Sequence, residues 1–194
     1  TPGPSPVPPS YIAQPGEGSH VEGYDNIVSG YGSHAEGVRN YVPGNYSHAE
    51  GINNSLLKNY AHVSGYNNIS NADCSETSGI WNTNNGYGSF VTSFYNECSY
   101  NHQTIVGKYN SNKSDTLFEV GNGNGISGDP KERSNAFEAH TDGRATIGAA
   151  PTNDMDVVNK KYFEDNLKTI NGQPIHGTGN LQVSVAQTGL FKHR

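Results

Sequence analysis

Small, mostly apolar residues recur through the first half of the chain at one position of a 14-residue phrase. Polar residues flank this position in most copies, which is the alternation expected of a strand with one buried face. We therefore predict that each copy contributes a short strand whose central side chain points into the interior. This inner column consists of Val21, Ala35, Ala49, Val63, Thr77, Val91 and Ile105.

A period of 14 residues is too short for helix-pair repeats, which need roughly 33 residues. It suits one coil of two short strands joined by two tight turns, and coils of this kind stack with parallel strands. Seven copies follow one another without insertion or deletion, and histidine marks the first four of them. The sequence therefore predicts an all-β fold whose main part is a parallel β-roll of about seven coils over residues 17–112.

Glycine closes the first strand in six of the seven copies, and asparagine follows it three residues later in all seven. Both residue types tolerate a positive φ, so we expect them to make the turns, with asparagine in the left-handed region. The predicted turn makers are Asn26, Asn40, Asn54, Asn68, Asn82, Asn96 and Asn110.

A second, largely apolar column follows the glycine, and a thin coil has no second layer to cover it. Three chains around one axis would bury it symmetrically, so we expect a homotrimer. The column consists of Tyr24, Val38, Ile52, Tyr66, Ile80 and Phe94. We expect columns of histidine and glutamate to line the same interface, namely His20, Glu22, His34, Glu36, His48, Glu50 and His62.

The histidine and glutamate columns allow two chemical interpretations. We favour a ladder of hydrogen bonds and ion pairs that sets the register between subunits. The alternative is a ring of histidines that holds an ion. Because glutamates stand so near, we expect the histidine pKa values to be raised, whereas burial would lower them.

Composition and charge exclude several functions. Hydrophobic residues make up only 32% of the chain, yet it contains 12 Tyr and 24 Gly, as expected of a thin repeating structure. The net charge of −6 and the lack of a basic stripe disfavour a nucleic-acid partner, and no apolar run is long enough for membrane insertion. Because the chain begins at Thr1, we expect a fragment or a processed product.

The sequence shows no catalytic or cofactor-binding constellation. A periodic column is a poor active site, and the glycine-rich string at residues 123–128 is followed by Asp129 and Pro130 rather than by a phosphate-binding helix. Cys74 and Cys98 form no disulfide framework, and we expect two free thiols. We therefore predict no enzyme activity, no cofactor and no bound metal.

Composition divides the chain into five segments. Residues 1–16 are proline-rich and predict an extended tether. The roll over 17–112 is followed by an irregular β connector over 113–150, where Asp142–Gly143 predicts a hairpin turn. Residues 151–168 predict a short trimeric helical stalk, and 169–194 predict a small β tip. The apolar seam of the stalk helix, which we place over 153–168, would be Met155, Val158 and Tyr162.

The repeat resembles a known pattern. The heads of trimeric autotransporter adhesins repeat a 14-residue phrase that folds as a left-handed parallel β-roll, although histidine and glutamate here replace two apolar positions. Residues 47–51 read Ser-His-Ala-Glu-Gly, a form that resembles variants in bacteriophage tail and fibre proteins. The phrases at 117–123, 134–145, 154–162 and 170–181 also resemble segments of phage fibres.

These resemblances imply a structural and attachment fibre of a phage virion, in the tail or the head. Its expected partners are two further copies of the chain, a larger virion assembly reached through the N-terminal linker, and a host cell-surface receptor or glycan. Trp81 is a candidate for stacking on a sugar. The head of a bacterial trimeric adhesin at the cell surface is the alternative, and a tailspike depolymerase is a third and weaker one because a narrow coil leaves little room for a cleft.

Overall fold

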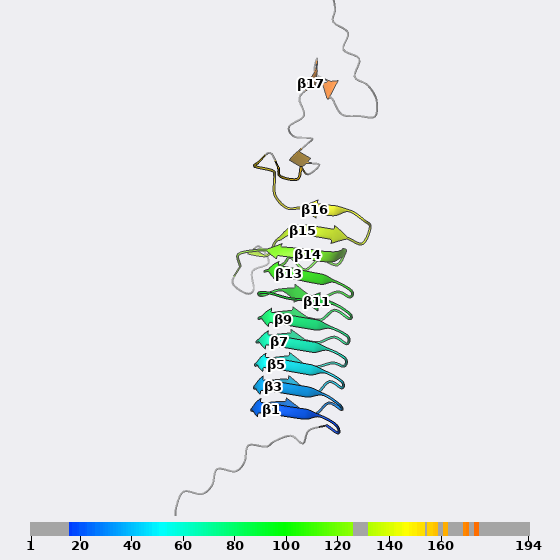
Figure 1. Cartoon of the computed structure of the whole chain (residues 1–194). Helices are drawn as coiled ribbons and strands as arrows, with labels where there is room; N and C mark the ends of the chain where they lie inside the picture. The colour runs from blue at the N-terminus through cyan, green and yellow to red at the C-terminus, as the bar shows by residue number, and fades with distance from the viewer. Residues whose placement is uncertain are drawn as a thin grey trace, which may run out of the picture. The chain divides into compact units, whose positions relative to one another are not determined.

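The computed structural model describes residues 16–125, 132–153, 155–158, 161–162, 169–170 and 173–174. The chain forms two compact units, Thr1–Ala149 and Ala150–Arg194, which are described separately below. The described part of the first unit is all-β, and its main element is a β-solenoid of about seven turns (Figure 1). The tether expected over residues 1–16 lies outside the described residues except for Gly16.

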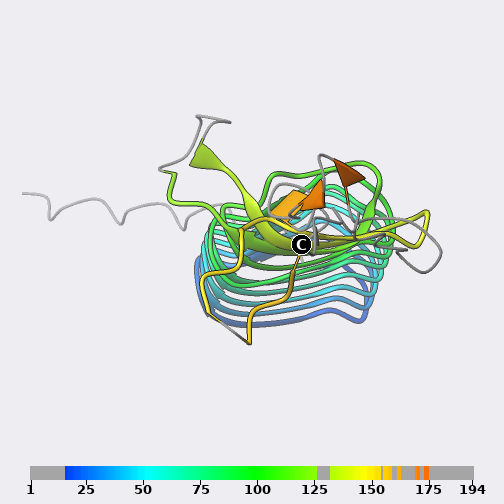
Figure 2. The ribbon, with the colours of Figure 1, turned by 90° about the horizontal axis from the view of Figure 1, so that it is seen from above.

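Each coil contributes a strand to one sheet, five residues long except in the sixth coil, and the first six coils also contribute a two-residue strand to a second sheet. Successive coils superpose when the roll is viewed along its axis (Figure 2). All strand pairs within the roll are parallel, with an offset of 14 residues such as His34↔His48. The first sheet contains β1 (His20–Tyr24), β3 (His34–Val38), β5 (His48–Ile52), β7 (His62–Tyr66), β9 (Glu76–Ile80), β11 (Phe90–Val91) and β13 (Thr104–Lys108). The second contains β2 (Ile27–Val28), β4 (Tyr41–Val42), β6 (Ser55–Leu56), β8 (Ile69–Ser70), β10 (Thr83–Asn84) and β12 (Glu97–Cys98).

The inner column is confirmed. All its members are fully buried except Val21, which belongs to the first coil that the structure describes. The short strands add a facing column of Val28, Val42 and Leu56, which then continues as Ser70 and Asn84. The interior is therefore polar at mid-height, and it divides into two separate apolar clusters.

The glycine column has the positive φ that the sequence predicts. Gly51 lies at φ 99°, and Ser93, which replaces glycine in one copy, lies at φ 84°. The next coil approaches so closely that a Cβ on Gly51 would lie 2.2 Å from the carbonyl oxygen of Gly65. Glycine is therefore required here for backbone conformation and for space.

The prediction that the asparagine column occupies the left-handed region is wrong. None of the seven has a positive φ, and the residue before each of them does, as with Asn53 at φ 56°. The residue types at that preceding position vary widely, from Asp25 and Arg39 to Trp81 and Tyr109. Asparagine is needed at its own position for a different reason, namely its side-chain amide.

Each asparagine joins its own coil to the two neighbouring coils. Asn54 Nδ2 donates to the carbonyl oxygens of Glu50 at 2.7 Å and Gly65 at 2.9 Å. Its Oδ1 accepts from the backbone N–H of Asn68 at 3.0 Å. The same pattern runs from Asn26 to Asn96, and the column is buried from Asn40 onward. One side chain per coil thus satisfies three backbone groups at the corner.

The asparagine ladder and the inner column end together at a buried carboxylate. Glu119 follows Ile105 in register and is fully buried. Its oxygens accept from Asn110 Nδ2 at 2.8 Å, from the backbone N–H of Lys113 at 2.9 Å and from Thr116 Oγ1 at 2.6 Å. Three donors offset the cost of burying this charge.

Antiparallel strands follow the last coil. β14 (Thr116–Asn122) pairs in parallel with β13, and β15 (Asn135–His140) and β16 (Ala145–Ile147) then add antiparallel strands to the same sheet. The hairpin predicted at Asp142–Gly143 is confirmed, with Gly143 at φ 85°. An N–H and the guanidinium of Arg144 donate to Asp142 and lower the pKa of its carboxyl group.

In the second unit, β17 (Thr169–Ile170) and β18 (Gln173–Pro174) form an antiparallel pair. Within the predicted stalk helix, the described residues 153 and 155–158 form turns and irregular structure, while residues 161 and 162 are helical. Asp156 accepts from the backbone N–H of Asn153 at 2.9 Å, as in a capping box, but no helix follows through residue 158. In the single chain residues 155–158 are therefore not helical, and the trimeric stalk helix stays a prediction. The rest of the stalk, and the tip beyond residue 174, lie outside the described residues.

Asn53 has the positive φ that was predicted for Asn54, and Asn54 makes the hydrogen bonds at the corner. Substitutions at the two positions test this assignment. Asn54→Leu leaves the carbonyls of Glu50 and Gly65 and the N–H of Asn68 without partners, so we expect a loss of about 3 kcal/mol or more in unfolding free energy. Asn53→Val should cost about 1–2 kcal/mol through its positive φ, and Asn53→Gly should cost less than about 1 kcal/mol. Urea unfolding at one protein concentration measures all three. A larger loss for Asn53→Gly than for Asn54→Leu would contradict this assignment.

Candidate functional site

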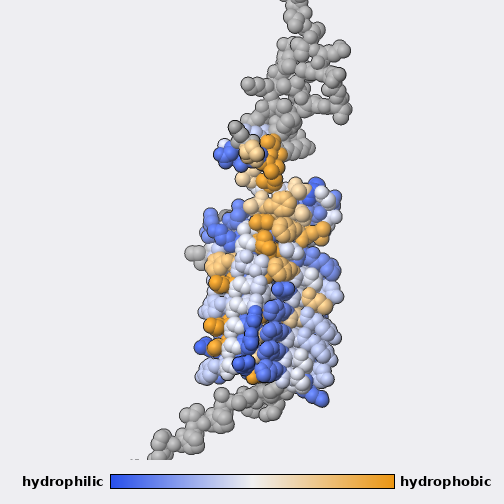
Figure 3. All heavy atoms as spheres, viewed as in Figure 1, coloured by the Kyte–Doolittle hydropathy of each residue, from blue (hydrophilic) through white to orange (hydrophobic). Residues whose placement is uncertain are grey.

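Polar and charged side chains gather on the outer face of the first sheet. The parallel register stacks His20, His34, His48 and His62 in one column, and it stacks Glu22, Glu36 and Glu50 in the next. Hydrophilic side chains cover the lower rungs of the roll, whereas apolar ones lie near the level of β13–β15 (Figure 3). In the upper rungs of the histidine column the same positions hold Phe90, Thr104 and Phe118. The structure thus brings all seven predicted polar residues to one face.

Three of the histidine rings, those of His34, His48 and His62, form a stack, and the ring of His20 meets His34 edge-on. The centroids of His34 and His48 lie 4.6 Å apart with an interplanar angle of 2°, and those of His48 and His62 lie 5.1 Å apart. The Nε2 atoms of His34, His48 and His62 are shielded from solvent and have no hydrogen-bond partner. Within one chain the nearest His–Glu pairs of these columns are 3.8–3.9 Å apart, and the ladder between subunits stays a prediction.

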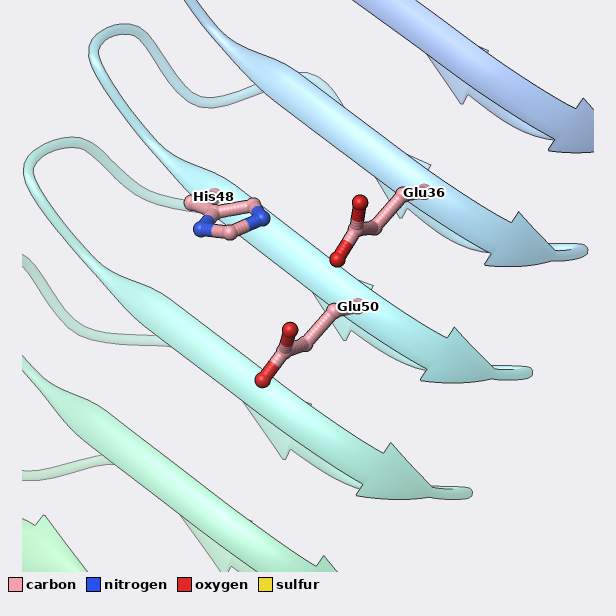
Figure 4. A group of neighbouring side chains, drawn as sticks. All are labelled: Glu36, His48 and Glu50. Carbon is pink, nitrogen blue, oxygen red and sulfur yellow. The ribbon is translucent and has the colours of Figure 1, made fainter.

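Two glutamates flank His48. Glu36 projects from β3, and Glu50 projects from β5 beside it, on the same side of the sheet (Figure 4). A ring nitrogen of His48 and one carboxylate oxygen from each glutamate all lie within 4.8 Å of one another. Among the residues that the structure describes, no Lys or Arg forms an ion pair with either glutamate.

The expectation of raised histidine pKa values is wrong for His48. Burial of the ring lowers its pKa below 6.5, and repulsion from His34 and His62 lowers it further. Glu50 and Glu36 act in the opposite direction but are outweighed. The spacing of the sequence shows that glutamates are near, but it does not show that stacked rings displace the water around each imidazole.

The apolar column beside the glycines is uncovered in the single chain. Tyr24 is 65% exposed, and Ile52, Tyr66, Ile80 and Phe94 are 37–44% exposed. This column and the histidine–glutamate columns belong to the strands of one sheet. Exposed apolar side chains therefore follow the roll from coil to coil beside the histidine and glutamate columns, and their role as a subunit interface stays a prediction.

Two aromatic ladders at the corners were missed by the sequence analysis. Trp81, Tyr95 and Tyr109 stack at 5.7 and 5.2 Å, and Tyr46 stacks on Tyr60 at 5.4 Å. All five residues have a positive φ. The available signal was the recurrence of aromatic residues at one position of the 14-residue repeat. In the first copies that position holds Asp25 and Arg39, so the aromatic pattern is not evident there. One face of Trp81 stacks on Tyr95, and Tyr66 makes an edge contact with it, while Trp81 remains 45% exposed, so that stacking on a sugar stays a prediction.

An ionic network lies beyond the last coil. His140 Nδ1 lies 3.1 Å from Asp115, and its Nε2 lies 2.8 Å from Thr146 Oγ1 and 3.4 Å from Glu138. Lys113 Nζ approaches the buried Glu138 at 2.7 Å. Through these contacts His140 links β15 to Thr146 on β16 and to Asp115 before β14.

No family model, curated protein or solved structure matches the chain. Within the described residues, no helix has both the length and the apolar character needed to cross a bilayer. Cys74 is exposed and Cys98 is buried, and both are free thiols as predicted. Burial raises the pKa of the Cys98 thiol.

The lowered pKa of His48 predicts how stability depends on pH. Above pH 6.5 the ring is neutral in the folded and unfolded states. As the pH falls from 6.5 through the folded pKa, the unfolded chain binds the proton first, so stability is lost. We expect the roll to melt at a lower temperature at about pH 5 than at about pH 8 when a chelator is present.

His48→Gln should reduce this pH-dependent difference in melting temperature. The matched control is His102→Asn, which removes an exposed imidazole at φ 59° and replaces it with a residue that tolerates this conformation. The four groups facing His48 that also titrate are His34, His62, Glu36 and Glu50. A higher melting temperature at about pH 5, abolished by His48→Gln, would mean that the glutamates dominate instead.

Proposed function

We propose that this chain is one of three identical subunits of a non-enzymatic attachment fibre carried by a bacteriophage virion. The β-solenoid provides an extended, rigid scaffold of identical rungs, which is the architecture that the resemblance to trimeric adhesin heads implies. The phrases at 117–123, 134–145 and 154–162 resemble phage fibres and favour a virion over a bacterial surface. An adhesin head at the bacterial surface remains the alternative, because it would use the same roll.

The observation that carries the trimer proposal is the exposed apolar stripe. Five large side chains of this column, Tyr24, Ile52, Tyr66, Ile80 and Phe94, are each more than a third exposed. Contiguous apolar surface of this kind is uncommon on a soluble monomer and marks an interaction site. Because the stripe follows the roll from coil to coil, a second copy aligned in parallel would meet the same residues at every rung. Closed symmetry with three copies would bury all three stripes at one axis.

The remaining roles in the proposal follow from position. The N-terminal segment would attach the fibre to the larger virion, while the corners with their exposed aromatic residues would face outward and offer contacts to a host receptor or glycan. Aromatic side chains provide large contact areas at low entropic cost, so they are well suited to such contacts.

Sedimentation equilibrium at micromolar concentration tests the assembly. We expect three chains per particle for the unmodified protein. Ile52→Glu combined with Ile80→Glu places six carboxylates at the proposed axis of a trimer and should give monomers. Ile69→Glu is the matched control, because Ile69 is 38% exposed but lies on the second sheet, and it should leave the trimer intact. A stable monomer of the unmodified chain would rule out the trimer.

Immunoelectron microscopy tests the location of the protein. Antibodies against residues 16–125 are applied to virions and to bacterial cells from the source of the sequence. We expect gold label on projections of the virion and no label on uninfected cells. Label confined to the cell surface would support the adhesin and contradict the fibre.

A further inference from the structure

The glutamate column places like charges at the spacing of neighbouring strands. Glu36 and Glu50 are directly paired in the register of β3 and β5, where strands lie about 4.8 Å apart. Like charges directly opposite one another are destabilising. No Lys or Arg forms an ion pair with them within the described part of the chain. A cation bound between these two carboxylates would remove the repulsion.

The third group at this position supplies nitrogen. His48 is on the same strand as Glu50, and one of its ring nitrogens lies within 4.8 Å of both carboxylates. Its Nε2 has no hydrogen-bond partner, so the ring has an unused electron pair or proton site. Imidazole and carboxylate together suit borderline transition metals, whereas Ca²⁺ and Mg²⁺ prefer all-oxygen sites.

The backbone leaves room for an ion and its water. A shallow groove is lined by Glu36 and Glu50 and by the neighbouring glycines Gly37, Gly51 and Gly65. Two carboxylates and one imidazole occupy three positions of a tetrahedral ion and leave the fourth open to water from this groove. Bonds of about 2.0–2.2 Å to Zn²⁺ require the three ligand atoms to close by only about 1–1.5 Å, which the partly exposed glutamate side chains can provide.

We propose that Glu36, His48 and Glu50 form a binding site for one Zn²⁺-like divalent transition-metal ion in each chain. Among the residues that the structure describes, this is the one place where three such ligand atoms converge. The neighbouring coils differ at these positions. The next coil has Ser64 in place of glutamate, and in the first described coil His20 and Glu22 are exposed. The ion cross-links two coils, and this inference does not depend on the proposed fibre.

Calorimetric titration with ZnCl₂ tests the site on the full, tag-free chain after treatment with EDTA. We expect about one Zn²⁺ per chain and a rise in melting temperature with Zn²⁺ concentration, because an ion that binds only the folded state stabilises it. MgCl₂ should give neither effect. His48→Gln and Glu50→Gln should each weaken Zn²⁺ binding by at least about tenfold.

Two controls match these variants. Glu17→Gln removes an exposed carboxylate from the start of the roll, and His102→Asn removes an exposed imidazole from a corner, so both should bind as the unmodified chain does. Circular dichroism in EDTA verifies that all variants are folded. As a second readout, Co²⁺ should give visible absorption bands that are lost in His48→Gln. An absence of Zn²⁺ binding, or equal binding by His48→Gln, would overturn the proposal.

Discussion

The corner after each long strand leaves two backbone carbonyls in need of donors, and one asparagine amide supplies both. The same side chain accepts from the next asparagine N–H, so every coil is tied to the coil before it and the coil after it. An unpaired buried carbonyl or N–H costs about 1–3 kcal/mol, so each interruption of the asparagine ladder would lower the stability of the roll by a similar amount. This constraint explains why asparagine occupies one position in all seven copies while the inner column varies between Ala, Val, Thr and Ile.

The fixed 14-residue period has a second consequence, because it places equivalent residues of successive coils next to one another. Apolar residues gain from this arrangement through a continuous core, and aromatic residues gain through stacking. Charged residues of one sign repel one another in this arrangement, and the paired glutamates of β3 and β5 are the clearest case. A bound cation would relieve that repulsion within one chain. The ring of histidines considered from the sequence would instead need three chains. Above these rungs the same face becomes apolar, with Phe90 and Phe118 in place of histidine.

Those features of the fold that depend on periodicity could be read from the sequence. The parallel coils, the inner column from Ala35 to Ile105 and the hairpin at Asp142–Gly143 follow from alternation and turn chemistry. The role of the asparagines could not, because a residue that tolerates positive φ and a residue that caps a corner are both commonly asparagine. At the true left-handed position the residues range from Arg39 to Trp81, so the sequence gives no signal there. The polar interior at Ser70 and Asn84 was likewise hidden, since the sequence does not show which backbone groups they satisfy.

The sequence predicted which residues share the candidate site, but it did not predict the direction of the His48 pKa shift. The sequence indicated that His48 and its neighbours share a face with Glu36 and Glu50, and the structure shows that they do. It gave the wrong direction for the His48 pKa, because ring stacking and the burial that follows from it are properties of the packed column. Residues 155–158 of the predicted stalk are not helical in the single chain, because a marginal helix needs tertiary support and seam spacing alone does not provide it.

The asparagine ladder is the central claim, and NMR hydrogen exchange of the asparagine side-chain amides tests it most directly. The buried Nδ2 groups of Asn54, Asn68, Asn82 and Asn96 each donate to two carbonyls, whereas Asn45 is exposed at a corner. The account predicts that the four buried side-chain amides exchange far more slowly than that of Asn45, with protection comparable to the backbone amides of β5 and β7. Exchange of the four at the rate of Asn45 would contradict it.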